Sequence, residues 1–531
     1  MRSIEQAVGR LLLGRIPGPT LNCEHRKQLA AGRLGGITLF KENCRSLEQL
    51  ARLAHDIVQS SMHVPVLTVD QEGGAVQRFE EALSPIPSPM ALATLGEDEL
   101  ARVTEIGASQ LQKLGFNLLL APTLDLQTNP LNPIICTRAF GSSPQQVSNA
   151  GLKAIESIER AGLRACGKHF PGHGSTSEDS HLALAVVAKS RAELLAEDLK
   201  PFIDNLPYLS SILVGHIWLS QIDEEPIPAT LSKKIVSGLL RQELGYDGLL
   251  VSDDMLMKGL TSRYGLSEAC ILALEAGLDL LLVLGTIEET MDAHRAVVEA
   301  VKSGRLSEAR ILASIKRLQK LFPERLRTFN LDEEETRLKL FAREVENATA
   351  SLVEISARAV VQHRQGFIRP EKNGLSQENT ASPLHATGTW HVLAPRHPRY
   401  PMNLADEIQR LEPRMQLSDW RYDLATDLEQ FSNRLSSLEG EKQVIFLTYR
   451  SFINKEQCKM MQDLLASCRV IHVAVDSPYD LVLSENSRET PSYALMDPSN
   501  LAIQGLARVL TGRAKAEGRL NLDLSPVELP V

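Results

Sequence analysis

The chain has 531 residues, of which 43% are hydrophobic and 23% are charged. A chain of this length exceeds what one hydrophobic core usually serves, and its composition is that of globular proteins, so we expect two or more folded domains. The formal net charge is −9 and no long basic run occurs, which argues against binding to nucleic acid or to an anionic membrane surface.

The cysteines and the N-terminus indicate the compartment. The seven cysteines are scattered and include no CxxC pair, which argues against a disulfide framework or a zinc knuckle and suits a reducing compartment. Glu5 and Arg10 interrupt the first residues, so the continuous apolar core of a signal peptide is missing. No apolar run approaches the roughly 20 residues that span a bilayer. We therefore expect a soluble, cytoplasmic protein of undetermined oligomeric state.

Short apolar runs alternate with amphipathic stretches from the N-terminus to about residue 320. The runs are often β-branched and show little polar alternation, as expected of strands buried on both faces. The predicted strands are 9–14, 35–40, 64–70, 116–122, 163–170, 210–217, 248–254 and 278–285. Helical patterns lie between them, for example at 47–60, 98–115, 144–162 and 266–277.

Eight strand–helix units over about 320 residues fit a closed (β/α)8 barrel, the TIM barrel, in count and in length. The alternative, an open doubly wound sheet, needs a glycine-rich phosphate turn after its first strand, and GRIPGPT at 14–20 is not such a turn. Polar side chains also gather where strands end: Asp70, Lys168, His169, His216, Asp253 and Asp254. In a barrel those ends face one mouth, where the active site is built. We predict an α/β fold with a catalytic barrel over 1–322.

The remainder of the chain predicts a second, smaller α/β domain. Residues 323–388 read as a charged helical connection followed by a polar linker. Residues 389–531 form the predicted C-terminal domain, with strands near 389–395, 442–449 and 469–476 and helices near 454–467 and 499–512. No motif in this domain carries chemistry, so we expect a packing or assembly role.

The segment GKHFPGHGSTSEDSH at 167–181 concentrates titratable side chains. Its histidines, at 169, 173 and 181, could share a metal if two of them lay four apart on one helical face, but Pro171 and the glycines beside it disfavour a helix. We therefore expect no metal. The other interpretations are a solvated connection and proton transfer. Asp179 lies two residues before His181, where a carboxylate can fix an imidazole tautomer, and imidazole gives and takes protons near neutral pH.

The strand ends also suggest a ligand. The carboxylates of Asp70, Asp253 and Asp254 would meet at the mouth with Lys168 and two arginine candidates, Arg78 and Arg138. Sugars are held by charged hydrogen bonds to their hydroxyl groups. This combination therefore predicts a polyol-binding site.

KHFPGHG, with Thr176 and DSH at 179–181, resembles the signature loop of bacterial β-N-acetylglucosaminidases of glycoside hydrolase family three. The resemblance extends over roughly residues 5–322, in the family's order, through GGITLFKEN, VDQEGGAVQRF, NLLLAPTLDL, TRAFG, VGHI, PATLS and VSDDMLMKG. Two positions depart from the pattern: Ser175 stands where the family usually has aspartate, and Ala139 where it usually has serine. The second α/β domain is similar to an accessory domain of longer members.

The resemblance implies a retaining mechanism without a cofactor. Asp253 would be the nucleophile, His181 the acid and base, and Asp179 the residue that orients His181. The resemblance also implies the substrate contacts: Asp70, Arg138, Lys168 and His169 on the N-acetylglucosamine ring, Arg78 and His216 nearby, and Met257 lining the pocket. The implied substrate is a small carbohydrate, a terminal β-linked N-acetylglucosaminide such as a peptidoglycan fragment (muropeptide).

Other functions stay open at this point. A neutral imidazole repels an anion less than a carboxylate does, so phosphate could replace water and make the enzyme partly a phosphorylase. A β-glucosidase or β-xylosidase of the same family is a second alternative, although those enzymes lack the DSH loop. A non-catalytic cell-wall sugar-binding protein is a third. If the protein is an enzyme, the substrate's own acetamide could replace Asp253 as the nucleophile.

Overall fold

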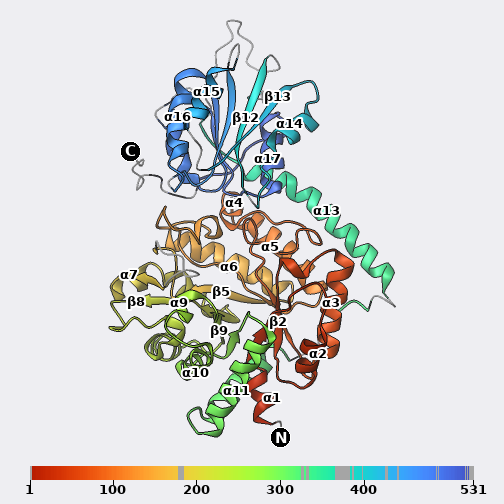
Figure 1. Cartoon of the computed structure of the whole chain (residues 1–531), viewed down its shortest axis with the longest axis vertical. Helices are drawn as coiled ribbons and strands as arrows, with labels where there is room; N and C mark the ends of the chain where they lie inside the picture. The colour runs from red at the N-terminus through yellow and green to blue at the C-terminus, as the bar shows by residue number, and fades with distance from the viewer. Residues whose placement is uncertain are drawn as a thin grey trace.

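The computed structural model describes residues 3–176, 184–323, 328–330, 334–364, 383–384, 388–397, 399–424, 428–438, 442–451, 453–485, 487, 490–520, 522 and 524. Figure 1 shows two parts: a barrel with its surrounding helices in the lower half and a separate sheet in the upper half. The long helix α13 (Glu335–Ala359) runs along one side and reaches both.

Eight parallel strands close into a barrel in the order β1-β10-β9-β7-β5-β4-β3-β2. They are β1 (Leu12–Gly14), β2 (Gly36–Leu39), β3 (Val66–Val69), β4 (Leu118–Leu119), β5 (Arg164–Phe170), β7 (Ser211–Val214), β9 (Leu249–Asp254) and β10 (Leu280–Leu282). Each lies within one of the eight predicted apolar runs, so the predicted barrel is confirmed. A small parallel pair, β6 (Ala185–Val187) and β8 (Ile217–Leu219), lies outside the barrel and was not expected.

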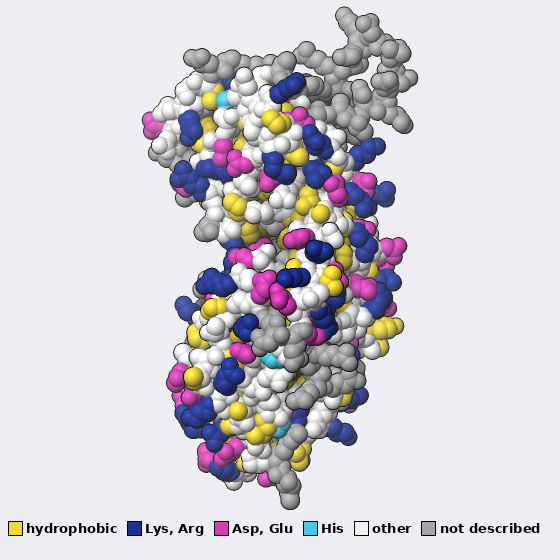
Figure 2. All heavy atoms as spheres, turned by 90° about the vertical axis from the view of Figure 1, so that its right-hand side faces the viewer, with side chains coloured by type: hydrophobic (Ala, Val, Ile, Leu, Met, Phe, Trp, Pro, Cys, Tyr) yellow, Lys and Arg dark blue, Asp and Glu magenta, His cyan; other side chains and the backbone are white. Residues whose placement is uncertain are grey.

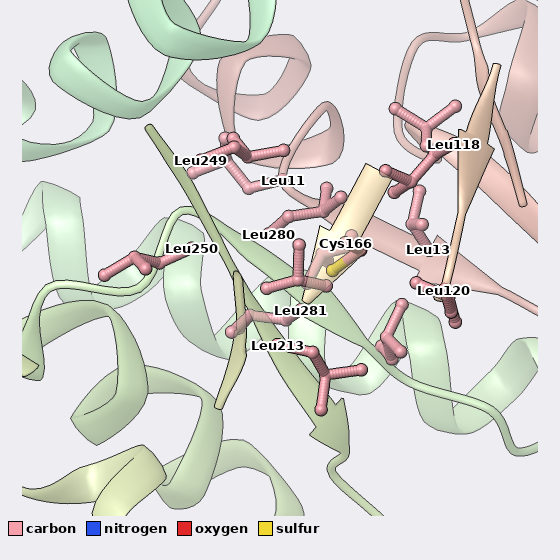
Figure 3. Close-up of a cluster of buried hydrophobic side chains, with 14 of the residues drawn as sticks. Leu11, Leu13, Leu118, Leu120, Cys166, Leu213, Leu249, Leu250, Leu280 and Leu281 are labelled. Atoms are coloured by element: carbon pink, nitrogen blue, oxygen red, sulfur yellow. The ribbon is translucent and has the colours of Figure 1, made fainter. Parts of the chain in front are cut away.

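Buried aliphatic side chains, mostly leucine, pack on both faces of the barrel strands. Figure 3 shows such a cluster gathered from several strands, among them Leu13, Leu118, Leu280 and Leu281, all with no exposed surface. Burying each such side chain contributes about 2 kcal/mol. The consecutive leucines of β1 and β10 are therefore explained by strands buried on both faces.

Local signals set the ends of the surrounding helices. The helix α3 (Leu47–Ser60) begins after Ser46, whose side chain accepts a hydrogen bond from the N–H of Gln49. The helix α10 (Leu266–Ala276) stops at Gly277, which has φ +121°, a conformation that side chains disfavour. The other helices of this part are α1 (Ile4–Gly9), α2 (Cys23–Ala30), α4 (Pro89–Ala93), α5 (Glu97–Lys113), α6 (Pro144–Arg160), α7 (Arg191–Ala196), α8 (Lys200–Asn205), α9 (Lys258–Thr261), α11 (Ile287–Lys302), α12 (Glu308–Leu321) and the π-helix η4 (Lys234–Glu243).

The second part is a six-stranded sheet in the order β11-β16-β15-β14-β12-β13. Its strands are β11 (Val361–Arg364), β12 (Thr389–Pro395), β13 (Gln416–Tyr422), β14 (Gln443–Thr448), β15 (Arg469–Ala474) and β16 (Ser492–Ala494), and only β11 runs antiparallel to its neighbour. Its helices are α14 (Leu404–Leu411), α15 (Leu428–Ser436), α16 (Glu456–Ser467) and α17 (Asn500–Leu510).

The sequence predicted three of these strands, β12, β14 and β15, which are apolar and central. It missed β11 and β16, which are four and three residues long, and β13, a polar edge strand with the sequence QLSDWRY. Because β11 belongs to this sheet, the span 323–388 predicted as a connection contributes a strand to it. The domain limits themselves stay a prediction.

The surface carries both signs of charge. Figure 2 shows lysine, arginine, aspartate and glutamate side chains intermingled over one face, without an extended basic patch there. Among the described residues, no helix combines the length and the apolar character that crossing a bilayer requires.

Candidate active site

The strand ends that carry the predicted site residues lie at the same end of the barrel. The register aligns Val69 with Leu119 and Leu119 with Ala165, and it aligns Phe170 with Val214 and Val214 with Ser252. The polar positions 70, 168–169, 216 and 253–254 therefore share the mouth formed by the carboxyl ends of the strands. This is the mouth at which barrel enzymes place their active sites.

A buried charged network occupies one side of the mouth. Lys168 on β5 donates a hydrogen bond of 2.7 Å to Asp70, and its Nζ lies 2.5 Å from a carboxylate oxygen of Glu72. Arg138 binds Glu72 in a bidentate manner, at 2.9 Å from Nε and 2.8 Å from Nη2. The side chains of Lys168 and Glu72 are only 2% and 1% exposed, so these charges compensate one another away from solvent.

The pKa values in the network follow from this pairing. Burial alone would raise the pKa of Glu72, but Arg138 and Lys168 outweigh it and hold the pKa well below the usual range. Burial would likewise raise the pKa of Asp70, but the charges of Lys168 and Arg78 lower it. Burial would lower the pKa of Lys168, and the two carboxylates raise it instead. All these groups are therefore charged at neutral pH.

His169 is held in a defined orientation beside the network. Its Nδ1 lies 2.7 Å from Oδ2 of Asp125, and its Nε2 lies 3.2 Å from Nη2 of Arg138. Since the guanidinium can only donate, Nε2 accepts from Arg138 and the Nδ1–H donates to Asp125. Asp125 also accepts from the backbone N–H groups of His169 and His173, at 3.0 and 2.6 Å. Burial would raise the pKa of Asp125, but the His169 ring and these hydrogen bonds lower it.

Sequence reasoning missed Glu72 and Asp125 as site residues. Both follow a barrel strand by a few residues, in VDQEGG and PTLDL, so the rule that polar residues gather after strands applies to them as well. Their roles depend on partners 66 and 44 residues away, Arg138 and His169, and no local spacing reveals those pairs.

Arg78 extends the site toward β2. Its Nη2 lies 3.7 Å from Asp70, and its guanidinium carbon lies 6.0 Å from the centre of the Phe40 ring. The Nε of Arg78 is buried and has no hydrogen-bond partner among the described residues. The Arg78 side chain as a whole is 22% exposed, so the accessible part of its guanidinium can donate to a ligand oxygen.

The two aspartates at the end of β9 have different surroundings. Among the described residues, Asp253 accepts one bond, of 2.9 Å, from the N–H of Asp254. The carboxylate of Asp254 accepts from the N–H groups of Leu256 and Leu284, both at 3.1 Å, and burial raises its pKa to about 6. Asp254 thus fixes the backbone. It does not cap a helix, because α9 begins after Met257, which is buried and donates to the carbonyl of Asp254.

His216 is fully buried directly behind this strand end. Its Nδ1 lies 2.7 Å from the Thr230 hydroxyl, and its Nε2 lies 2.9 Å from the carbonyl oxygen of Asp254. Both ring nitrogens therefore contact protein groups. This arrangement indicates that His216 supports the end of β9 rather than contacting a sugar.

Asp179 and His181, the predicted acid–base pair, lie outside the described residues. The part of their segment that is described ends at Thr176 and is held by the loop after β4. Asn132 donates to the carbonyls of His173 and Gly174 at 2.8 and 3.2 Å, and Asn129 donates to the carbonyl of Thr176 at 3.2 Å.

Comparisons with known proteins agree with this geometry. Residues 3–321 match the glycosyl hydrolase family 3 N-terminal domain. A β-hexosaminidase of Idiomarina loihiensis is 35% identical over 320 residues, which are 57% of this chain and 96% of that protein. A β-hexosaminidase of Alkalilimnicola ehrlichii is 37% identical over 288 residues, which are 52% of this chain and 80% of that protein.

Solved structures resemble nearly the whole chain. A glycoside hydrolase family 3 β-N-acetylglucosaminidase from a Paenibacillus species superposes with a TM-score of 0.84 at 28% identity, covering 99% of both chains. A β-glucoside phosphorylase at 18% identity and a TM-score of 0.77 shows the shared fold alone. The family domain matches more than half of this chain. The chain therefore belongs to glycoside hydrolase family 3 and is a glycoside hydrolase similar to bacterial β-hexosaminidases.

Proposed function

We propose that the chain is a retaining exo-β-N-acetylglucosaminidase. The observation that carries the proposal is the network that joins Asp70, Glu72 and Lys168 to Arg138 and His169 at the barrel mouth. It presents both charged donors and charged acceptors, the combination that holds several sugar hydroxyls at once. The similarity to β-hexosaminidases and to the Paenibacillus β-N-acetylglucosaminidase supports N-acetylglucosamine as the sugar.

In the proposed first step, a carboxylate oxygen of Asp253 attacks the anomeric carbon while the bond to the leaving oxygen breaks. His181 gives its proton to that oxygen, and the product is a glycosyl ester on Asp253 plus the free aglycone. In the second step, His181 takes a proton from water, whose oxygen attacks the anomeric carbon and releases Asp253. The two inversions leave the sugar with its original β configuration. Asp179 keeps His181 oriented through both steps.

The contacts around Asp253 and Asp254 support this division of roles. Asp254 uses its carboxylate on two backbone N–H groups, and burial raises its pKa to about 6. Asp253 accepts a backbone bond from its neighbour and is half-buried, so part of its side chain is accessible to a substrate. Arg78, whose side chain is 22% exposed beside Asp70, would donate to a ligand oxygen there.

The proposed natural substrate is a muropeptide from peptidoglycan, with a terminal N-acetylglucosamine in the site. We also propose a cytoplasmic location. The seven cysteines, all described and all free, support a reducing compartment.

The proposal is tested by incubating the purified chain with an aryl N-acetyl-β-glucosaminide and following the released sugar by NMR. We expect N-acetylglucosamine that appears first as the β anomer. Release of the α anomer would contradict the retaining mechanism, and faster release from the matching aryl glucoside would favour a β-glucosidase. Added phosphate distinguishes a phosphorylase, which would form the sugar 1-phosphate.

A further inference from the structure

Arg138 reaches the charged network from a loop that the second sheet holds. It is the last residue of the one-turn helix η2 (Cys136–Arg138), which follows β4. The two residues before it both contact Asp476, a fully buried carboxylate that follows β15. The Sγ of Cys136 and the hydroxyl of Thr137 donate to its two oxygens, each at 3.5 Å. Asp476 of the second part thus contacts the two residues before Arg138, the arginine proposed to contact the sugar.

Arg450 ties the same carboxylate to the same loop from another strand. It follows β14, and its Nε donates to Asp476. Its Nη1 donates to the carbonyl oxygen of Pro133, at 2.8 Å. One guanidinium therefore bridges the second sheet and the loop, and the pair with Asp476 is shielded from solvent on the carboxylate side.

The backbone on both sides of this contact is in an uncommon conformation. Cys136 has φ +40° and Arg450 has φ +48°, in the left-handed region that residues other than glycine rarely adopt. Such conformations persist where the surrounding contacts determine them, and they cluster at functional sites. Here the contacts that determine them cross from one sheet to the other.

The same loop also supports the start of the segment that leads toward His181. Asn132 donates to the carbonyls of His173 and Gly174, as described above, and its Oδ1 accepts from the backbone of Ile134 and Ile135. Movement of the loop would therefore disturb Arg138 and this segment together.

The loop after β3, which carries Glu72 and Arg78, has its own contacts with the second part. Arg399 donates to the carbonyl of Gln77 at 3.3 Å, and the backbone N–H of Ser88 donates to Asp497 at 3.0 Å. The two loops that carry Arg78 and Arg138, two of the proposed sugar contacts, thus both contact the second part, which lies beyond the family domain matched over 3–321.

We propose that Asp476 and Arg450 are positioning residues for the hydrolase: they set the loop so that Arg138 meets the sugar. This assigns the second sheet a part in substrate binding rather than in packing alone. The inference rests on the proposed contact between Arg138 and the sugar, so the test separates the two.

The test is a double-mutant cycle on Asp476 and Arg138, with kcat and KM measured on an aryl N-acetyl-β-glucosaminide. Asp476→Asn keeps the size of the side chain but replaces one acceptor by a donor, which then faces Arg450 or the loop. Loss of a contact that is equally strong in the ground state and in the transition state raises KM and leaves kcat unchanged. We therefore expect KM to rise about tenfold and kcat to stay within about threefold of wild type. On the Arg138→Lys background, Asp476→Asn should change KM less than about twofold, because coupled residues are not additive.

Two further variants keep the test decisive. Arg450→Lys retains the charge beside Asp476 but cannot reach both Asp476 and Pro133, so KM should rise in the same direction, even where Asp476→Asn does not fold. Glu344→Gln is the matched control: it removes the ion pair between α13 and Lys113 on α5, another contact with the barrel, and should leave kcat and KM unchanged. Circular dichroism and thermal unfolding establish that each variant is folded.

The outcomes are distinct. If Arg138→Lys raises KM and folded Asp476→Asn and Arg450→Lys leave it unchanged, the positioning role is wrong while the proposed function stands. The positioning role is equally wrong if the effects of Asp476→Asn and Arg138→Lys on KM multiply. If Arg138→Lys itself leaves KM unchanged, the proposed sugar contact is wrong, and with it the basis of the inference.

Discussion

Lys168 on β5 donates a 2.7 Å hydrogen bond to Asp70, which follows β3, although β4 lies between these strands in the barrel. This bond and the contact of Lys168 with Glu72 connect the end of β5 with the end of β3. The electrostatic compensation is complete enough to lower the pKa values of both carboxylates despite their burial. Because these charges compensate one another, the network needs no charge from a ligand to remain buried.

Glu72→Gln should destabilise the fold in a pH-dependent manner. Removing one partner leaves Lys168 and Arg138 undercompensated, and breaking a buried pair costs about 3 kcal/mol. The folded-state pKa of Glu72 is depressed, so its contribution is present above the unfolded value near 4 and is lost as the pH falls through the folded pKa. Urea unfolding at pH 7 and at pH 4 checks this; a difference between wild type and variant that grows toward pH 4 would contradict it.

The barrel could be predicted from the sequence because its strands are buried on both faces. Short apolar runs such as LDLLLVLG are typical of such strands, and their polar ends locate the mouth. The partners within the mouth could not be predicted in this way. Nothing local links Glu72 to Arg138 or Asp125 to His169, because each pair forms only when the barrel closes.

In the second sheet, too, the sequence predicts the apolar strands but not the contacts between distant residues. Its central strands β14 and β15 are apolar and were predicted, whereas β13 exposes one edge and alternates polar residues. Asp476 and Arg450 carry no motif. Their place beside Cys136 and Thr137 emerges only from the packing of the second sheet on the barrel loops.

Substitution of the two neighbouring aspartates of β9 should affect kcat to different extents. Asp253→Asn removes the proposed nucleophile and should lower kcat by at least about a thousandfold. Asp254→Asn keeps an oxygen for the N–H groups of Leu256 and Leu284, so its kcat should stay within about tenfold of wild type. Initial rates on an aryl N-acetyl-β-glucosaminide decide the point. The reverse ranking would assign the chemistry to Asp254.

Asp254 should also make the free energy of unfolding depend on pH. Its folded-state pKa, about 6, lies above the usual value, so its stabilising contribution is present below pH 4 and is lost as the pH rises through 6. Relative to Asp254→Asn, the wild type should lose about 2–3 kcal/mol of unfolding free energy between pH 4 and pH 7. Denaturant unfolding across this range measures the difference. A flat difference would show that the carboxyl group is not titrating near pH 6.

Asp125→Asn tests the orientation of His169. The amide keeps one acceptor, but the variant loses the charge that holds Nδ1–H and two backbone N–H groups. Loss of such an orienting partner should lower kcat/KM roughly tenfold to a hundredfold. Asp198→Asn is the comparison: it replaces another buried carboxylate, one paired with Lys189, and should leave kcat/KM near wild type. Equal losses in the two variants would point to a general effect on folding.

The central claim is a covalent sugar ester on Asp253. The direct measurement is mass spectrometry of the intact protein, and then of its peptides, after treatment with a 5-fluoro N-acetylglucosaminyl inactivator. The account predicts one added sugar per chain, on the peptide that contains Asp253, and none in Asp253→Asn. An active enzyme that is never labelled would favour attack by the substrate's own acetamide, and a label on any other residue would contradict the assignment of the nucleophile.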